Sequence, residues 1–193
     1  MPTPIARSRA ATQWADGFNE ASTLARNLGA GCFADVTEHS GLMAPSRSVT
    51  GFGTVALDAD NDGRLDLFAA NGHVDDAPWR HRPMAELPHF YRSIGDGRFE
   101  QTNAAATGTY FTRPVVGRGA AVGDLDNDGR LDIVVVHRDR PLAMLHNVTD
   151  ASHSLGVWLR GKISASTPVG ARVICQFRRI APLGWSDACR RCR

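Results

Sequence analysis

The chain has 193 residues, of which 42% are hydrophobic and 22% are charged, and its formal net charge is +2. A chain of this length and composition can bury a core and form one domain or two small ones. The near-neutral charge argues against nucleic acid as a partner, and we expect no membrane span, because no run of roughly 18 to 20 apolar residues occurs.

Short extended segments dominate the prediction in chain order. Residues 19–28 carry a weak helical stripe, and no other window of the sequence shows a better one. Runs rich in branched or aromatic residues and bounded by turn residues predict strands. They are residues 54–58, 65–70, 89–93, 98–102, 120–124, 131–137 and 143–147. The sequence therefore predicts an all-β protein.

The chain repeats itself with a period of 66 residues. This shift aligns DADNDGRLD at 58–66 with DLDNDGRLD at 124–132, and RNLGAGCF at 26–33 with RSIGDGRF at 92–99. Repeated units of about four short strands favour a β-propeller, in which each unit forms one blade. A propeller closes with roughly four to eight blades. We therefore expect an incomplete propeller.

Glycines recur at matching places in the repeat. GFG at 51–53 aligns with GRG at 117–119. A dinucleotide-binding loop is not favoured, because such a loop should open a helix and this one leads into an acidic stretch. We expect these glycines to let strands approach closely at the inner edge of a blade.

Each acidic loop has the donor pattern of a calcium site. Carboxylates occupy positions 1, 3, 5 and 9, the glycine at position 6 permits a sharp turn, and the backbone carbonyl at position 7 adds an oxygen. Hard oxygen donors at this density suit Ca²⁺ better than Mg²⁺ or Zn²⁺. The candidate ligands are Asp58, Asp60, Asp62, Arg64 through its carbonyl, and Asp66 in the first loop, and Asp124, Asp126, Asp128, Arg130 through its carbonyl, and Asp132 in the second.

Electrostatics also favours an ion in these loops. Two carboxylates about 4 Å apart repel by roughly 1 kcal/mol in water and roughly 4 kcal/mol at an effective dielectric near 20. A bound dication reverses the sign of that interaction.

An EF-hand is excluded, because position 12 is Ala69 in one loop and Val135 in the other. The alternative is a solvated acidic turn between two strands, which the duplication makes less favoured.

The combined motifs resemble a known family. Residues 51–74, 90–102 and 117–147 resemble the FG-GAP and VCBS repeats of calcium-binding propellers such as integrin alpha chains, and more closely the UnbV and cartilage acidic protein 1 group. Residues 153–173 are similar to the opening of the ASPIC/UnbV domain that follows the repeats in that group. The resemblance implies a secreted or cell-surface propeller with calcium in its blade loops, no known catalytic centre, and a role in adhesion or binding.

The expected domain organisation follows from the repeat and this resemblance. It comprises an unassigned segment at 1–18, propeller repeats at 19–148 with units of about 23–88 and 89–148, the beginning of an ASPIC/UnbV-like domain at 149–175, and an Arg- and Cys-rich tail at 176–193. The composition changes abruptly after Val173, which suggests a frameshift or a truncated gene model. The expected fold class is thus an incomplete β-propeller of four-stranded blades, with the start of a further β domain, in a fragment of a longer protein.

The function we expect is a non-catalytic calcium-binding module that binds a protein or carbohydrate ligand. The full-length protein would be secreted, periplasmic or at the cell surface, although this chain shows no signal peptide. We expect no enzyme activity, since no catalytic base is identifiable. The alternative is an accessory repeat domain of a larger secreted enzyme. A third possibility is a fragment that aggregates through exposed strand edges and blade faces.

Overall fold

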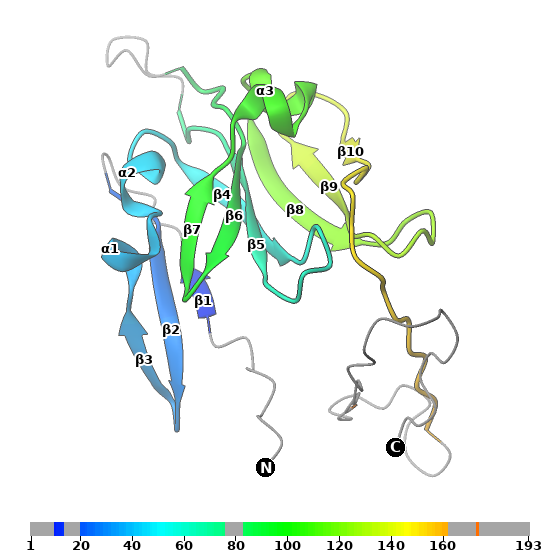
Figure 1. Cartoon of the computed structure of the whole chain (residues 1–193). Coiled ribbons are helices and arrows are strands. Elements are labelled where there is room, and N and C mark those ends of the chain that lie inside the picture. The colour runs from blue at the N-terminus through cyan, green and yellow to red at the C-terminus, as the bar shows by residue number, and fades with distance from the viewer. Residues whose placement is uncertain (1–9, 14–19, 76–82, 162–172, 174–193) are drawn as a thin grey trace. The chain divides into compact units, whose positions relative to one another are not determined.

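The computed structural model describes residues 10–13, 20–75, 83–161 and 173 (Figure 1). The chain separates into two compact units, Met1–Leu155 and Gly156–Arg193, and all of the described helices and strands belong to the first. The strands are β1 (Ala10–Gln13), β2 (Thr23–Gly29), β3 (Cys32–Asp35), β4 (Gly51–Leu57), β5 (Asp66–Asn71), β6 (His89–Gly95), β7 (Arg98–Gln101), β8 (Gly117–Gly123), β9 (Asp132–His137) and β10 (Ala143–Leu145). The short helices are α1 (Thr37–Ser40), α2 (Met43–Ser46), α3 (Ala104–Thr107) and the 3-10 helix η2 (Thr109–Thr112).

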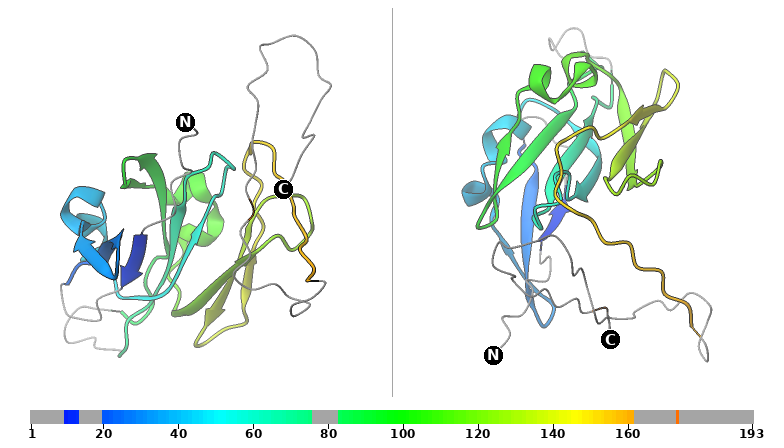
Figure 2. Two further views of the ribbon diagram at one scale, coloured as in Figure 1. Left: turned by 90° about the horizontal axis from the view of Figure 1, so that it is seen from below. Right: turned by 45° about the vertical axis from the view of Figure 1, so that its right-hand side comes forward.

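The strands form three antiparallel sheets. The first sheet has the order β1-β2-β3, the middle sheet β4-β5-β6-β7, and the third sheet β10-β9-β8. The middle sheet lies between the other two (Figure 2). The predicted predominance of β-structure is confirmed, and one of the sheets has the expected four strands. The described strands do not close a propeller.

The sequence repeat and the sheets are out of phase. The expected boundary between residues 88 and 89 falls between β5 and β6, which pair within the middle sheet. The expected unit 23–88 therefore contributes β2 and β3 to one sheet and β4 and β5 to the next. A repeat in sequence determines the period of the fold, whereas strand pairing determines which residues begin a sheet.

The weak helical stripe at residues 19–28 forms no helix among its described residues, in keeping with the expected all-β fold. Residues 23–29 form β2, which pairs with β3 through a tight turn. Gly29, Ala30 and Gly31 of this turn all have positive φ, of 92°, 51° and 78°. Glycine adopts this left-handed region freely, so the Gly-Ala-Gly sequence permits the hairpin and ends any helix.

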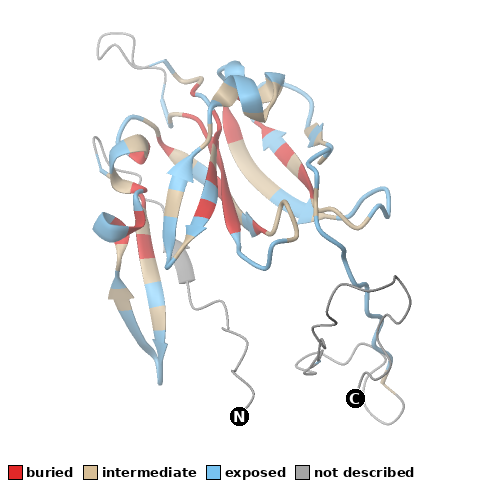
Figure 3. Cartoon of the chain, viewed as in Figure 1, coloured by how far each residue is buried: buried red, intermediate tan, exposed pale blue. Residues whose placement is uncertain are grey.

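The core lies on both faces of the middle sheet, because successive residues of a strand point to opposite faces. All six residues of β5 are buried (Figure 3). One face packs on the first sheet through Leu24, Leu42, Leu67, Ala69 and Tyr91. The other face packs on the third sheet through Leu57, Phe68, Ala70, Phe111, Ile133 and Val135. Each large apolar side chain buried here stabilises the fold by roughly 1.5–3 kcal/mol.

Glycine permits the close contact between the middle and third sheets. A Cβ atom on Gly53 of β4 would lie 2.6 Å from the backbone of Gly119 and Ala120 in β8. A Cβ atom on Gly117 would lie 2.9 Å from the carbonyl oxygen of Asn71. The expectation that glycine allows strands to approach closely is confirmed at Gly53 and Gly117, whereas a Cβ atom on Gly119 would meet nothing within 4 Å among the described residues.

The other expected segments are described in part or not at all. The expected ASPIC/UnbV-like segment at 149–175 has no helix or strand among its described residues, 149–161 and 173, and its other residues and the tail at 176–193 lie outside the described residues. The expected N-terminal segment 1–18 also lies outside them, except for β1. Among the described residues, no helix has the length and apolar character needed to cross a membrane.

Candidate functional site

The first acidic loop joins β4 to β5 and is shaped by its own aspartates. The carboxylate of Asp58 accepts hydrogen bonds from the backbone N–H groups of Asp62, at 2.9 Å, and Gly63, at 2.8 Å. Asp62 in turn accepts one from the N–H of Arg64, at 2.8 Å. Gly63 has a φ of 85°, which allows the chain to reverse around the Asp58 carboxylate.

The second acidic loop, between β8 and β9, repeats this arrangement. Asp124 accepts hydrogen bonds from the N–H groups of Asp128 and Gly129, both at 3.0 Å, and Asp128 accepts one from Arg130 at 2.9 Å. The φ of Gly129 is 84°. The same sequence pattern therefore produces the same loop twice.

The first three carboxylates of each loop converge. Oxygen atoms of Asp58, Asp60 and Asp62 all lie within 4.8 Å of one another, and those of Asp124, Asp126 and Asp128 do the same. Carboxylate oxygens that already accept an N–H bond keep further lone pairs for a cation. These six of the ten predicted residues are brought together as the loop pattern predicts.

Asp66, at position 9, does not join the first cluster. Its side chain is buried and accepts hydrogen bonds from the N–H of Ala59, at 3.3 Å, and of Ser93 in β6, at 2.8 Å. Burial raises the pKa of Asp66, and the negative charges of Asp60 and Asp62 act in the same direction, while the two hydrogen bonds oppose it. Asp66 therefore fastens the loop to the next strand.

Asp132 occupies the same position in the second loop. It is buried and accepts hydrogen bonds from the N–H groups of Leu125, at 3.0 Å, and Asn147, at 2.9 Å. Burial raises its pKa, but these bonds and His146, whose Nδ1 lies 3.2 Å from the carboxylate, outweigh burial and the pKa is lowered. His146 also brings Asp132 into a cluster with Asp126.

The arginines of the loops contact the cluster through their side chains. The prediction concerned the backbone carbonyls of Arg64 and Arg130, but the structure pairs their guanidinium groups with Asp62 and Asp128. A cation at either cluster would compete with that arginine for the carboxylate. The sequence pattern gave no indication of this pairing.

The two carboxylate oxygens of Asp60 differ in their partners. One of its carboxylate oxygens pairs with Arg92 at 2.6 Å. The other oxygen, Oδ1, is buried and has no hydrogen-bond partner among the described residues. An unpartnered buried carboxylate oxygen is costly, so the donor set of the first loop fits a cation.

Two asparagines tie the acidic loops to each other. The side-chain amide of Asn61 donates to the carbonyl of Gly129 in the second loop, at 3.1 Å. The side-chain amide of Asn147 donates to the carbonyls of Ala59, at 2.8 Å, and Leu131, at 3.3 Å. Sequence reasoning missed this link, for which Asn61 at position 4 of the first loop was the available signal, whereas Asn147 lies outside both loop patterns.

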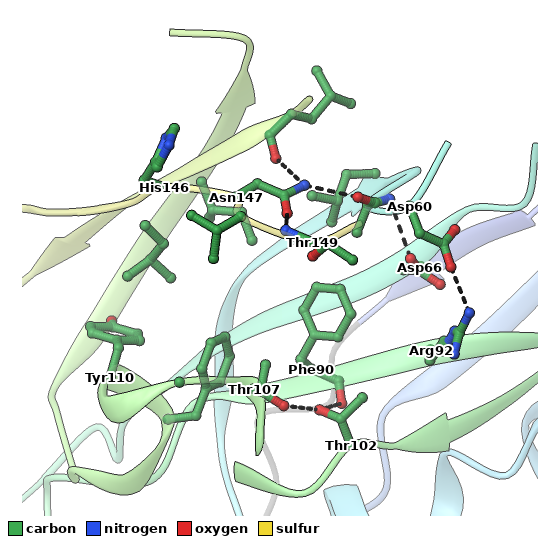
Figure 4. Close-up of a pocket in the computed structure, with 18 of the residues that line it drawn as sticks. Asp60, Asp66, Phe90, Arg92, Thr102, Thr107, Tyr110, His146, Asn147 and Thr149 are labelled. Atoms are coloured by element: carbon green, nitrogen blue, oxygen red, sulfur yellow. Dashed lines mark hydrogen bonds and ion pairs between the residues drawn. The ribbon is translucent and has the colours of Figure 1, made fainter. Parts of the chain in front are cut away.

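A cavity of about 790 Å³ lies beside the first loop (Figure 4). Its wall is formed by apolar side chains of the middle and third sheets together with α3 and η2, and Asp60 and Arg92 line it. Tyr110, which also lines it, donates or accepts a hydrogen bond with His137 at 2.8 Å. The cavity therefore combines an apolar wall with a charged pair, Asp60 of the first loop and Arg92 of β6.

Comparison with known proteins gives one family match. No curated protein matches the chain. Residues 71–135, from the end of β5 through the second acidic loop into β9, match the model of the FG-GAP-like repeat family. The chain thus contains a segment similar to an FG-GAP-like repeat, within a β-rich fold that is consistent with a β-propeller.

Proposed function

We propose that the protein is a calcium-stabilised repeat module that binds a ligand and catalyses no reaction. The observation that supports it most strongly is the pair of acidic loops, which are 66 residues apart in sequence and share one hydrogen-bonding pattern. In each loop three carboxylates converge. Oxygen donors of this kind and number suit Ca²⁺.

The chemistry of the first loop supports an ion at Asp58, Asp60 and Asp62. The buried Oδ1 of Asp60 has no hydrogen-bond partner among the described residues, so a bound cation would offset the cost of its burial. When bound, calcium would supply positive charge that offsets the mutual repulsion of the carboxylates. Asp66 would hold the loop against β6 rather than contact the ion, because both of its oxygens accept backbone hydrogen bonds.

The role we propose for this module is binding or adhesion outside the cytoplasm. Extracellular calcium modules function with weak sites, with dissociation constants of about 10⁻⁴–10⁻³ M. The partner would be a protein or a carbohydrate that docks on the loops, where the cavity beside Asp60 offers apolar and charged groups together. The assignment of residues 149–175 to an ASPIC/UnbV-like domain, in a fragment of a longer secreted or cell-surface protein, remains part of this proposal.

Thermal unfolding in calcium tests the proposal. We expect about 10 mM CaCl₂ to raise the melting temperature of the full chain by several degrees, since this is about 100 times a dissociation constant of about 10⁻⁴ M and adds roughly 2.7 kcal/mol. MgCl₂ at the same ionic strength should have a smaller effect. The double variant Asp60→Asn and Asp126→Asn removes one charge from each cluster while keeping side-chain shape, and it should lose the calcium response.

The matched control is Asp139→Asn, which removes a carboxylate charge outside both loops. This variant should retain the full calcium response. A native chain whose melting temperature is the same in CaCl₂ and in EDTA would rule the proposal out, as would a double variant that responds like the native chain.

A further inference from the structure

One hydrogen bond runs directly from the first acidic loop to the second. The side-chain amide of Asn61 donates to the carbonyl of Gly129 at 3.1 Å. Asn61 lies between Asp60 and Asp62, two candidate ligands of the first loop, and Gly129 follows Asp128, a candidate ligand of the second. The bond therefore joins the two loops at the parts of each that would close around an ion.

Asn147, which follows β10, forms a second connection between the loops (Figure 4). Its side-chain amide donates to the carbonyl of Ala59 in the first loop, at 2.8 Å, and to that of Leu131 in the second, at 3.3 Å. Its backbone N–H donates to the carboxylate of Asp132 at 2.9 Å. A side-chain amide carries two N–H donors, so this one residue can hold both loops at once.

The equivalent place in the middle sheet shows what the Asn147 side chain adds. There the backbone N–H of Ser93 donates to Asp66 at 2.8 Å, as the N–H of Asn147 does to Asp132. A serine hydroxyl has a single donor, so Ser93 cannot bond two carbonyls in this way. The backbone bond to the ninth residue of the loop is thus common to both places, whereas the bridge between loops depends on the asparagine side chain.

We propose that Asn61 and Asn147 couple the two acidic loops, so that calcium bound in one loop raises the affinity of the other for calcium. This inference rests on the calcium sites of the proposed function. Without an ion, repulsion among three convergent carboxylates favours an open loop, and a bound dication favours the closed one. The bonds between the loops need both loops closed, so they stabilise the chain with two ions more than the chain with one. The effect of each site on the other is then reciprocal.

Nuclear magnetic resonance of the isotope-labelled, chelator-treated full chain, titrated with CaCl₂, tests the coupling loop by loop. The N–H groups of Gly63 and Gly129 report on one loop each, because each donates to the first aspartate of its own loop. We expect cooperative binding curves for the native chain. Asp60→Asn removes the first site and should raise the midpoint calcium concentration at Gly129 by about fivefold or more, and Asp126→Asn should do the same at Gly63.

Substitution of the two asparagines separates coupling from binding. Asn147→Ser introduces the residue type of the equivalent place in β6 and keeps the backbone bond to Asp132. Asn61→Gly removes the amide at a backbone φ of 54°, which glycine adopts freely. Each variant should still bind calcium in both loops but with reduced cooperativity, and the double variant should bind two ions independently. Circular dichroism should show the native fold for every variant.

Asn127→Gly serves as the matched control, because Asn127 has the position of Asn61 in the second loop and a similar φ of 61°. It should titrate like the native chain. Three results would overturn the coupling and leave the calcium sites in place: an unchanged Gly129 midpoint in Asp60→Asn, cooperative binding in the double asparagine variant, or loss of cooperativity in Asn127→Gly. A native chain in which neither glycine responds to calcium would contradict the proposed function and the coupling together.

Discussion

At the scale of single residues, the aspartates of one loop divide into two roles. Asp58 and Asp62 shape the turn while remaining exposed enough to contact an ion. Asp66 is buried and joins the loop to β6. One D-x-D-x-D-G-x-x-D pattern therefore contains both the candidate ligands and the residue that fixes the loop in the sheet, and the two roles differ in burial.

A buried histidine should make the stability of the fold depend on pH. His89 in β6 is buried, its Nδ1 lies 2.9 Å from the Tyr91 hydroxyl, and burial lowers its pKa to about 4. In the unfolded chain the pKa returns to about 6.5, so between these values the unfolded state binds the proton more readily and stability falls as pH falls. The expected loss from pH 7 to about pH 4 is up to about 3 kcal/mol.

Urea unfolding in EDTA at a series of pH values measures this effect. His89→Gln has no imidazole to protonate, so the variant should lose that part of the pH dependence. His39→Gln replaces an exposed histidine and should keep it. Equal slopes for the native chain and His89→Gln would contradict the assignment to His89.

At the scale of elements, the two hairpins that the repeat aligns differ in one turn residue. The β2–β3 turn contains Ala30 with a φ of 51°, and the β6–β7 turn contains Asp96 with a φ of 54°. The backbone is the same in both, but aspartate tolerates the left-handed region better than alanine. The β2–β3 hairpin therefore holds avoidable strain.

Relieving that strain should stabilise the protein. Ala30→Asn is expected to raise the free energy of unfolding by about 1 kcal/mol, because a left-handed backbone costs alanine roughly 1–2 kcal/mol. Asp96→Ala, in the equivalent turn, should lower it by a similar amount. Urea denaturation of both variants checks the pair. An unchanged midpoint for both would show that the turn conformation contributes nothing to stability.

At the scale of the whole molecule, the sequence predicts local structure better than long-range connections. The loop pattern correctly predicts the convergence of Asp58, Asp60 and Asp62, since these residues lie within five positions of one another. The bond between Asp66 and Ser93 spans 27 residues and that between Asn147 and Ala59 spans 88, so neither follows from spacing. The residues at which each sheet begins within the repeat were not predicted for the same reason, because they depend on the pairing of β5 with β6.

The calcium sites are the central claim, and direct binding tests them most simply. Isothermal titration of the chelator-treated full chain with CaCl₂ should show one bound ion for each acidic loop. Asp60→Asn alone should remove the site in the first loop and leave the site in the second. Absence of binding at millimolar calcium, or an unchanged stoichiometry in the double variant Asp60→Asn and Asp126→Asn, would contradict the claim.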